Sequence, residues 1–279
     1  MSLRKISAAL AVIMAAAAVC CVSAKATGTQ EKTEVYVTIS VGETKLAHEK
    51  TAVTDVDSDG SLTVSDALFC AHEENFEGGA AAGYAAEKTE YGLSLTKLWG
   101  TQYESGFGYY VNNTAAMSLE DEIHDGDGIS AFAFTDTVGW SDTYSFFDND
   151  AVTLPQEGGK VSLTLYAAGY DESWNPVTYP VSGAEIIIDG VSQGIMTDEN
   201  GAVELDFDTQ GRYIVSAKSD SRLLVPPVCV VSAGEQTEER TETVRERKPD
   251  FKTYVIMLIV LCVIVFLALG AIRKKRGRA

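Results

Sequence analysis

Hydrophobic and polar residues alternate over much of the middle of the chain, which predicts a protein built mainly from β-strands. The clearest run is residues 35–41, which alternate as a half-buried strand does. The sequence also predicts a helix over residues 65–74. Similar β-rich runs, separated by turn sequences rich in Asp, Asn and Gly, lie at residues 130–134, 161–166, 184–188, 202–207 and 213–217.

The N-terminal end has the pattern of a secretory signal peptide. Two basic residues precede an apolar run over residues 8–22, and small residues follow it. We therefore expect a signal peptide over residues 1–24. The alternatives are a lipoprotein modified at Cys20 or Cys21, and an uncleaved N-terminal anchor.

The C-terminal end predicts a transmembrane helix over residues 254–272. This segment carries no charge, and at ~1.5 Å per residue it spans ~28 Å, about the hydrocarbon thickness of a bilayer. The alternative is a buried core helix, but such a helix carries a polar stripe. Basic residues crowd the tail, residues 273–279, and basic residues stay on the cytoplasmic side. We expect a single-pass type I protein of the cell membrane with its bulk outside the cell.

The chain is strongly acidic, with 22 Lys and Arg against 40 Asp and Glu and a net charge of −18. The two end segments contain basic residues but no acidic ones, so the part between them is more acidic still. This charge excludes nucleic acid as a partner, because nucleic-acid binding needs a basic footprint. It favours divalent cations instead.

Residues 55–66 match a twelve-residue calcium loop. Ca²⁺ prefers six to eight oxygen ligands, and the loop offers carboxylates at positions 1, 3, 5 and 12 and a backbone carbonyl at position 7. Gly60 at position 6 permits the sharp turn, and Thr63 at position 9 can contribute through water. The predicted ligands are Asp55, Asp57, Asp59, Ser61 and Asp66. The segment resembles dockerin and EF-hand loops, which implies calcium as a structural cofactor; an acidic turn without metal is the alternative.

The region after the loop is rich in aromatic residues. A Tyr-Tyr-Val-Asn strand at residues 109–112, a turn at residues 125–128 and a following strand resemble a bacterial surface domain of unknown function. That domain is similar to the C-terminal β-domain of the cobalamin carriers transcobalamin and intrinsic factor. The resemblance covers about residues 35–150 and implies a compact β-rich domain, with a corrinoid or another small ligand as an open role. The aromatic candidates for a ligand cleft are Trp99, Tyr109, Tyr110 and Trp140; the alternative is that these rings form the core.

Residues 160–232 resemble the prealbumin-like, collagen-adhesin B-type modules of bacterial surface proteins. The resemblance rests on a strand at residues 184–188, an Asp-Gly hairpin after it, and a Glu-Asn-Gly turn at residues 199–201. It implies a small β-sandwich that acts as a spacer.

Two cysteines remain between the end segments, Cys70 and Cys229. They form either one disulfide or two buried thiols, since both have apolar neighbours. No catalytic motif is present: His72 and Glu73 begin a zinc-protease pattern, but position 76 is Phe where the second His is needed. We therefore expect no enzymatic activity.

Together these patterns predict a mainly β fold: an aromatic-rich α+β domain, a small β-sandwich and a C-terminal single transmembrane helix. The expected function is a non-enzymatic, calcium-binding adhesion or binding module on a bacterial cell surface. Its partner would be an extracellular protein, glycan or small molecule, and the alternative function is a receptor for a small molecule such as a corrinoid. The expected segments are a signal peptide (1–24), a transcobalamin-C-terminal-like domain with the calcium loop (25–154), a β-sandwich (160–232), a charged stalk (233–252), a transmembrane helix (254–272) and a cytoplasmic basic tail (273–279).

Overall fold

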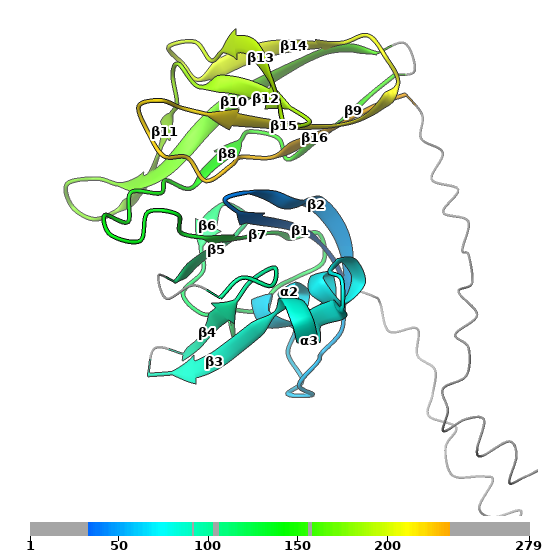
Figure 1. The fold of residues 1–279 in the computed structure, drawn as a ribbon, viewed down its shortest axis with the longest axis vertical. Coiled ribbons are helices and arrows are strands. Elements are labelled where there is room, and N and C mark those ends of the chain that lie inside the picture. Colours follow the sequence, from blue (N-terminus) through cyan, green and yellow to red (C-terminus); the bar gives the residue numbers. More distant parts are fainter. Residues whose placement is uncertain (1–32, 91, 103–105, 156–157, 235–279) are drawn as a thin grey trace, which may run out of the picture. The chain divides into compact units, whose positions relative to one another are not determined.

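The predicted strand at residues 35–41 belongs to a five-stranded sheet with the order β2-β1-β7-β5-β6 (Figure 1). The computed structural model describes residues 33–90, 92–102, 106–155 and 158–234. The strands β1 and β7 run parallel, and the other neighbours in the sheet are antiparallel. The bounds of the strands are β1 (Thr33–Val41), β2 (Glu43–Val53), β5 (Phe107–Val111), β6 (Thr114–Ala115) and β7 (Gly128–Ala133).

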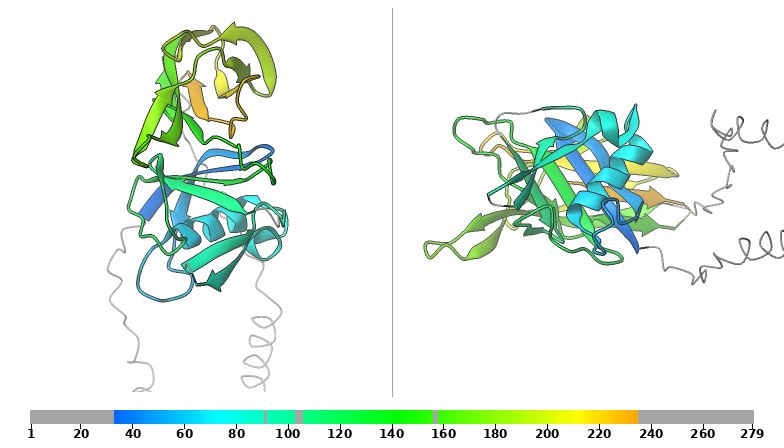
Figure 2. Two further views of the ribbon diagram at one scale, coloured as in Figure 1. Left: turned by 90° about the vertical axis from the view of Figure 1, so that its left-hand side faces the viewer. Right: turned by 90° about the horizontal axis from the view of Figure 1, so that it is seen from below.

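One face of this sheet carries a hydrophobic core. Val35, Val37 and Ile39 occupy alternate positions of β1, so they point to the same face, where all three are fully buried. Helix α2 (Val64–Asn75) packs against them and confirms the helix predicted at residues 65–74. Figure 2 shows the helices on one side of this sheet. The short helix α3 (Gly79–Gly83) and the hairpin of β3 (Ala85–Thr89) and β4 (Gly92–Lys97) complete this layer.

A β-sandwich follows. In one sheet β10 lies between β11 and β14 and also pairs with β8, and the other sheet has the order β13-β12-β15-β16-β9. The apolar residues of the two sheets meet in one buried cluster, to which Leu163 and Leu165 of β10 and Ile186 of β12 contribute. The strands predicted at residues 161–166, 184–188, 202–207 and 213–217 are confirmed as β10, β12, β14 and β15. The bounds are β8 (Ser145–Phe147), β9 (Ala151–Leu154), β10 (Gly159–Tyr170), β11 (Pro176–Pro180), β12 (Glu185–Ile188), β13 (Val191–Met196), β14 (Ala202–Phe207), β15 (Gly211–Lys218) and β16 (Cys229–Ala233).

The first strands of the sandwich lie before the domain boundary that the sequence predicted between residues 154 and 160. Strand β8 pairs with β10, and β9 pairs in parallel with β16. These two strands are three and four residues long, which is too short for a periodic pattern to reveal them. Their partners are far away in the sequence, so only the folded chain shows where they belong.

The second face of the five-stranded sheet is polar and aromatic, and it too is covered. Phe132 of β7 forms a buried cluster with Tyr144 and Val225, two residues that lie beside sandwich strands. The guanidinium of Arg212 in β15 donates a hydrogen bond of 2.8 Å to the carbonyl of Ala47 in β2. The described residues therefore form one compact unit.

The predicted transmembrane helix, residues 254–272, lies outside the described residues. So do the signal peptide, nearly all of the stalk, and the basic tail. Within the ranges given above, no helix has both the length and the apolar character needed to cross a bilayer.

Candidate functional site

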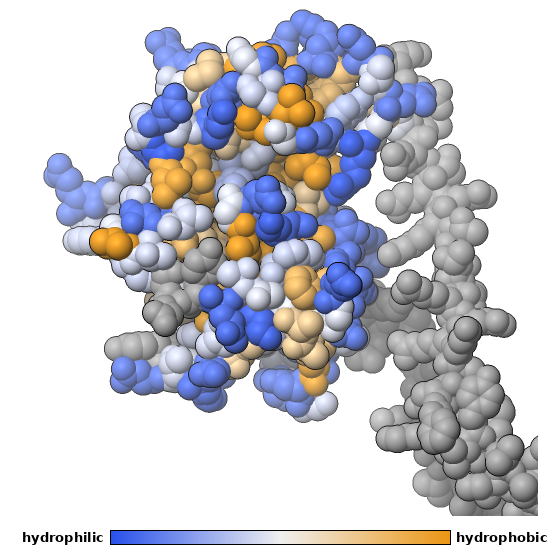
Figure 3. Space-filling view, viewed as in Figure 1, coloured by the Kyte–Doolittle hydropathy of each residue, from blue (hydrophilic) through white to orange (hydrophobic). Residues whose placement is uncertain are grey.

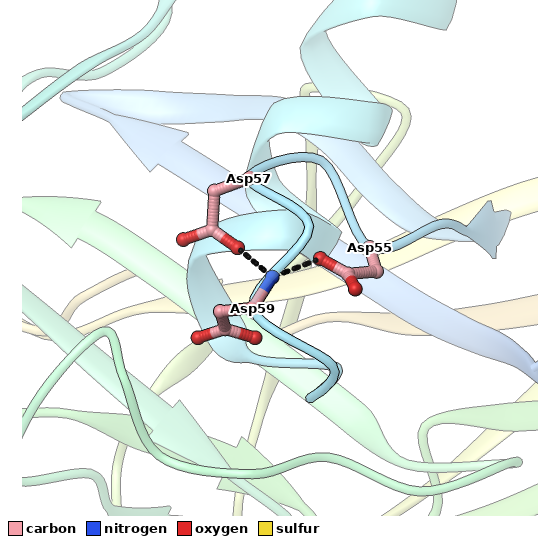
Figure 4. Close-up of side chains that lie close together, drawn as sticks. All are labelled: Asp55, Asp57 and Asp59. Carbon is pink, nitrogen blue, oxygen red and sulfur yellow. Dashed lines mark hydrogen bonds between the residues drawn. The ribbon is translucent and has the colours of Figure 1, made fainter.

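The predicted calcium loop folds so that three of its carboxylates converge. Asp55, Asp57 and Asp59 each offer an oxygen atom, and these oxygens all lie within 4.8 Å of one another (Figure 4). The carboxylate of Asp55 accepts hydrogen bonds from the backbone N–H groups of Asp59 (3.2 Å) and Gly60 (2.9 Å). Gly60 has a φ of 95°, a conformation that favours glycine, which agrees with the sharp turn predicted at this position. The loop is therefore curled around its own acidic groups.

The environment of Asp57 disfavours its negative charge. Partial desolvation and the negative charges of Asp59, Asp66 and Asp55 raise the pKa of Asp57, while a hydrogen bond from the backbone of Asp59 acts in the opposite direction. A divalent cation would remove this repulsion. Hard oxygen ligands of this kind fit Ca²⁺.

Asp66, the predicted ligand at position 12, has a different environment. It is buried, and its carboxylate accepts hydrogen bonds from the backbone N–H of Val56 (2.9 Å), the N–H of Thr63 (3.0 Å) and the Thr63 hydroxyl (2.7 Å). Thr63 and Asp66 form the capping box of α2. The structure therefore places Asp66 behind the loop, where it ties the loop to the helix, and outside the group of three carboxylates. The carbonyl of Ser61, the fifth predicted ligand, belongs to the same turn, in which the Ser61 N–H donates to Asp59 (2.8 Å).

The four aromatic candidates do not meet in one cleft. Trp99 lies beside α2, with its ring centroid 5.3 Å from that of His72 and 5.2 Å from that of Phe76. Tyr109 packs against the core on the helix-covered face of the sheet. Tyr110, the next residue of β5, lies on the other face and stacks on Tyr144 with a centroid distance of 3.7 Å.

Trp140 lies apart from the other three candidates, in the loop between β7 and β8. Its side chain is 53% exposed and makes an edge contact with Phe134. Tyr109 and Tyr110 are neighbours in one strand, so their side chains point to opposite faces of the sheet. Most of the four aromatic candidates therefore pack against other side chains and do not line a shared cleft.

The candidate disulfide between Cys70 and Cys229 is not formed. Both thiols are free and buried. Cys70 lies in α2, 3.7 Å from the hydroxyl of Thr54, whereas Cys229 lies in β16 within the core of the sandwich. Burial, reinforced by the negative charges of Asp150 and Asp148, raises the pKa of Cys229 to about 12, so this thiol stays protonated at neutral pH.

The hairpin of β10 and β11 carries a group of exposed rings that the sequence analysis missed. Tyr170, Trp174 and Tyr179 are 57%, 82% and 41% exposed. A cleft of about 340 Å³ opens between this hairpin and the hairpin of β5 and β6. The available signal was the segment Gly-Tyr-Asp-Glu-Ser-Trp-Asn-Pro at residues 169–176, in which two large rings flank an exposed turn.

The surface around these sites is mostly hydrophilic. In Figure 3 hydrophilic residues cover most of the visible face, and hydrophobic residues form separate patches among them. Large exposed hydrophobic side chains outside the β10–β11 hairpin include Met117, Val138 and Val191. Isolated exposures of this kind are normal, so they do not by themselves mark a site.

Comparisons with known proteins add little to this geometry. No family model matches the chain, and no curated protein matches it either. Among solved structures, the chain is similar to crystal structures of the N-terminal four Ig domains of Dscam1, isoforms 4.44 and 9.44. Each shares 9% identity over 72% of this chain and 44% of the solved chain, with TM-scores of 0.23 and 0.22. The chain thus spans less than half the length of either structure, and likenesses with TM-scores this low carry no argument about its function.

Proposed function

We propose that this protein is a calcium-stabilised, non-enzymatic binding module displayed on the outer side of a bacterial cell membrane. The observation that carries the proposal is an uncharged cleft beside exposed aromatic rings on a strongly acidic protein. Of these rings Tyr170 lines the cleft, and a hollow bordered by an exposed ring is typical of sites that bind a partner. The acidic charge keeps such a module soluble and repels anionic polymers.

Two of the histidines, His48 and His72, and the two described cysteines support a role without catalysis. Both ring nitrogens of His72 are engaged inside the fold, His48 stacks on Tyr36, and the two described thiols are buried. A nucleophile or a general base needs access to a substrate. These side chains serve packing instead.

The corrinoid receptor that the resemblance suggested has less support. Its four aromatic candidates lie on different faces and elements, so they do not frame one pocket. The partner of the module would then be a protein, a glycan or another small molecule outside the cell. Residues 254–272 would anchor it.

Calcium binding is tested by calorimetry on the full chain in detergent. We expect heat on titration with Ca²⁺ and a dissociation constant of ~10⁻⁴–10⁻³ M, as in exported calcium modules. At 10 mM Ca²⁺ this affinity raises the free energy of unfolding by ~1.4–2.7 kcal/mol. The variant Asp57→Ala is expected to lose both effects, whereas Asp208→Ala, which removes an exposed carboxylate far along the sequence in the sandwich, retains them.

Two results would count against this proposal. If the unmodified chain gives no heat at millimolar Ca²⁺, the calcium-binding part of the proposal is wrong. Protease added to intact cells is expected to cleave residues 33–234, and full protection of that region would remove the display outside the cell. A screen of proteins, glycans and small molecules with and without Ca²⁺ then tests binding itself.

A further inference from the structure

The cleft beside the β10–β11 hairpin is a candidate site with its own chemistry. Its volume of about 340 Å³ is within the range of small-ligand sites. Among the residues that the structure describes, no charged side chain lines it, whereas a larger hollow near the β1–β2 turn is lined by Glu43, Asp189 and Lys218 and by no described aromatic ring. Its lining includes Tyr110, Asn113, Thr114, Tyr170, Pro176 and Thr178.

The pairing of β10 and β11 places a ring and apolar atoms along one side of the cleft. Tyr170 lies opposite Pro176, and Ala168 lies opposite Thr178. Residues at alternate positions share a face of the hairpin, so these four border the cleft together. Trp174 at the tip lies outside the lining and contacts Tyr170, with a centroid distance of 6.1 Å and the two rings tilted by 47°.

The tip of the hairpin is held in place by hydrogen bonds. The carboxylate of Asp171 accepts hydrogen bonds from the backbone N–H groups of Ser173 and Asn175, each at 2.8 Å. It also accepts a hydrogen bond from the side-chain amide of Asn175. Trp174 has a φ of 62°, an unusual conformation for a bulky residue, and such conformations collect at binding sites. Because the turn is fixed before a ligand arrives, little conformational entropy is lost on binding.

The opposite side of the cleft supplies uncharged polar groups. The hydroxyl of Tyr144 donates to the amide oxygen of Asn113 (2.8 Å), which leaves the amide nitrogen of Asn113 able to donate to a ligand. The hydroxyls of Thr114 and Thr178 can each donate and accept. The cleft therefore combines ring faces with hydroxyl and amide groups and offers no ion partner.

A ligand that matches this set has apolar faces, many hydroxyl groups and no charge. We propose that the cleft binds a neutral oligosaccharide, with the C–H face of one sugar ring stacked on Tyr170 and its hydroxyls bonded to Asn113, Thr114 and Thr178, while Trp174 at the tip contacts a neighbouring sugar. The proposal rests on the binding function proposed above and names its ligand class and site. Sialylated or sulfated sugars bind less well, because Asp171 and Glu172 lie at the tip and the chain carries a net charge of −18.

The test uses the full chain in detergent and a panel of neutral oligosaccharides built from glucose, galactose, mannose and N-acetylhexosamines, with sialylated forms as counterparts. Binding is measured by calorimetry and by tryptophan fluorescence. We expect at least one neutral oligosaccharide to bind more tightly than its sialylated counterpart at low salt. The variants Tyr170→Ala and Trp174→Ala are each expected to weaken that binding tenfold or more, and Tyr170→Phe, which keeps the ring face, to weaken it less than threefold.

The matched control is Trp140→Ala, which removes an exposed tryptophan from another loop, and it is expected to change the affinity less than twofold. A loss confined to Trp140→Ala would overturn the site, and so would a failure of every neutral oligosaccharide to bind. Binding of a protein or peptide that is unchanged by Tyr170→Ala and Trp174→Ala would overturn this inference and leave the binding function standing. If no ligand of any class binds, both proposals fail.

Discussion

At the scale of single residues, His72 shows how a buried side chain fixes its neighbours. Its Nε2 accepts a hydrogen bond from the backbone N–H of Trp99 (3.0 Å), and its Nδ1 donates one to the carbonyl of Leu68 (2.6 Å). This arrangement needs a neutral ring, because a protonated Nε2 has no lone pair to accept a hydrogen bond. Burial lowers the pKa of His72, and the hydrogen bond to Leu68 opposes that effect. The sequence identified this histidine only as one half of a failed zinc motif.

The protonation of His72 predicts a pH dependence. Because its pKa in the folded state lies below the usual value of about 6.5, the unfolded chain binds the proton first as the pH falls. The contribution of His72 to stability is complete above pH ~6.5 and is lost as the pH falls toward the folded-state pKa, by at most ~1.4 kcal/mol per pH unit.

The direct measurement for His72 is an NMR titration of its ring. We expect His72 to titrate below pH 6.5. His48 belongs with His72, since burial and the nearby charge of Arg212 lower its pKa as well. A pKa at or above 6.5 for His72 would contradict the prediction.

At the scale of elements, α2 is defined by its first turn. Thr63 has an extended conformation, with φ −127° and ψ 167°, and its side chain accepts the N–H of Asp66 while the Asp66 carboxylate accepts the N–H of Thr63. The sequence located this helix to within one residue at each end, because apolar spacing is a local signal, but it did not single out Thr63 as the cap. The β10–β11 hairpin gave no such signal for its second strand, where prolines at both ends and exposed residues hide the pattern.

The cap of α2 is tested by Thr63→Ala. The loss of the capping hydroxyl is expected to lower the free energy of unfolding by ~1–2 kcal/mol, measured by urea denaturation without added Ca²⁺. The control Thr137→Ala removes an exposed hydroxyl from a loop and is expected to change stability by less than ~0.5 kcal/mol. Equal effects of the two substitutions would mean that the cap contributes nothing.

At the scale of the whole molecule, the five-stranded sheet is covered on both faces. Tyr144 covers the face of the sheet opposite α2: it is 6% exposed, stacks on Tyr110 and donates a hydrogen bond to Asn113. Burial is the main reason that its pKa is raised, so its hydroxyl remains a donor at physiological pH. A shared buried contact of this kind couples the unfolding of the sheet to that of the sandwich.

This coupling predicts one unfolding transition for residues 33–234. Tyr144→Ala is expected to lower the free energy of unfolding by ~3–5 kcal/mol, since it leaves a cavity between aromatic neighbours, and to keep the transition single. Tryptophan fluorescence and circular dichroism should give the same midpoint. In contrast, Trp140→Ala in the exposed loop is expected to shift it little. Two transitions, with only one moved by Tyr144→Ala, would show that the two regions unfold independently.

The sequence by itself determined the features that depend on neighbouring residues. It located α2, the strands β1, β10, β12, β14 and β15, and the turn that brings Asp55, Asp57 and Asp59 together, because spacing, capping and turn chemistry act over a few residues. The tertiary structure alone decided the rest. It separated Trp99, Tyr109, Tyr110 and Trp140 and brought Tyr110 and Tyr170 to one cleft. Such contacts join residues far apart in the chain, and the burial that selects them exists only after the sheets have packed.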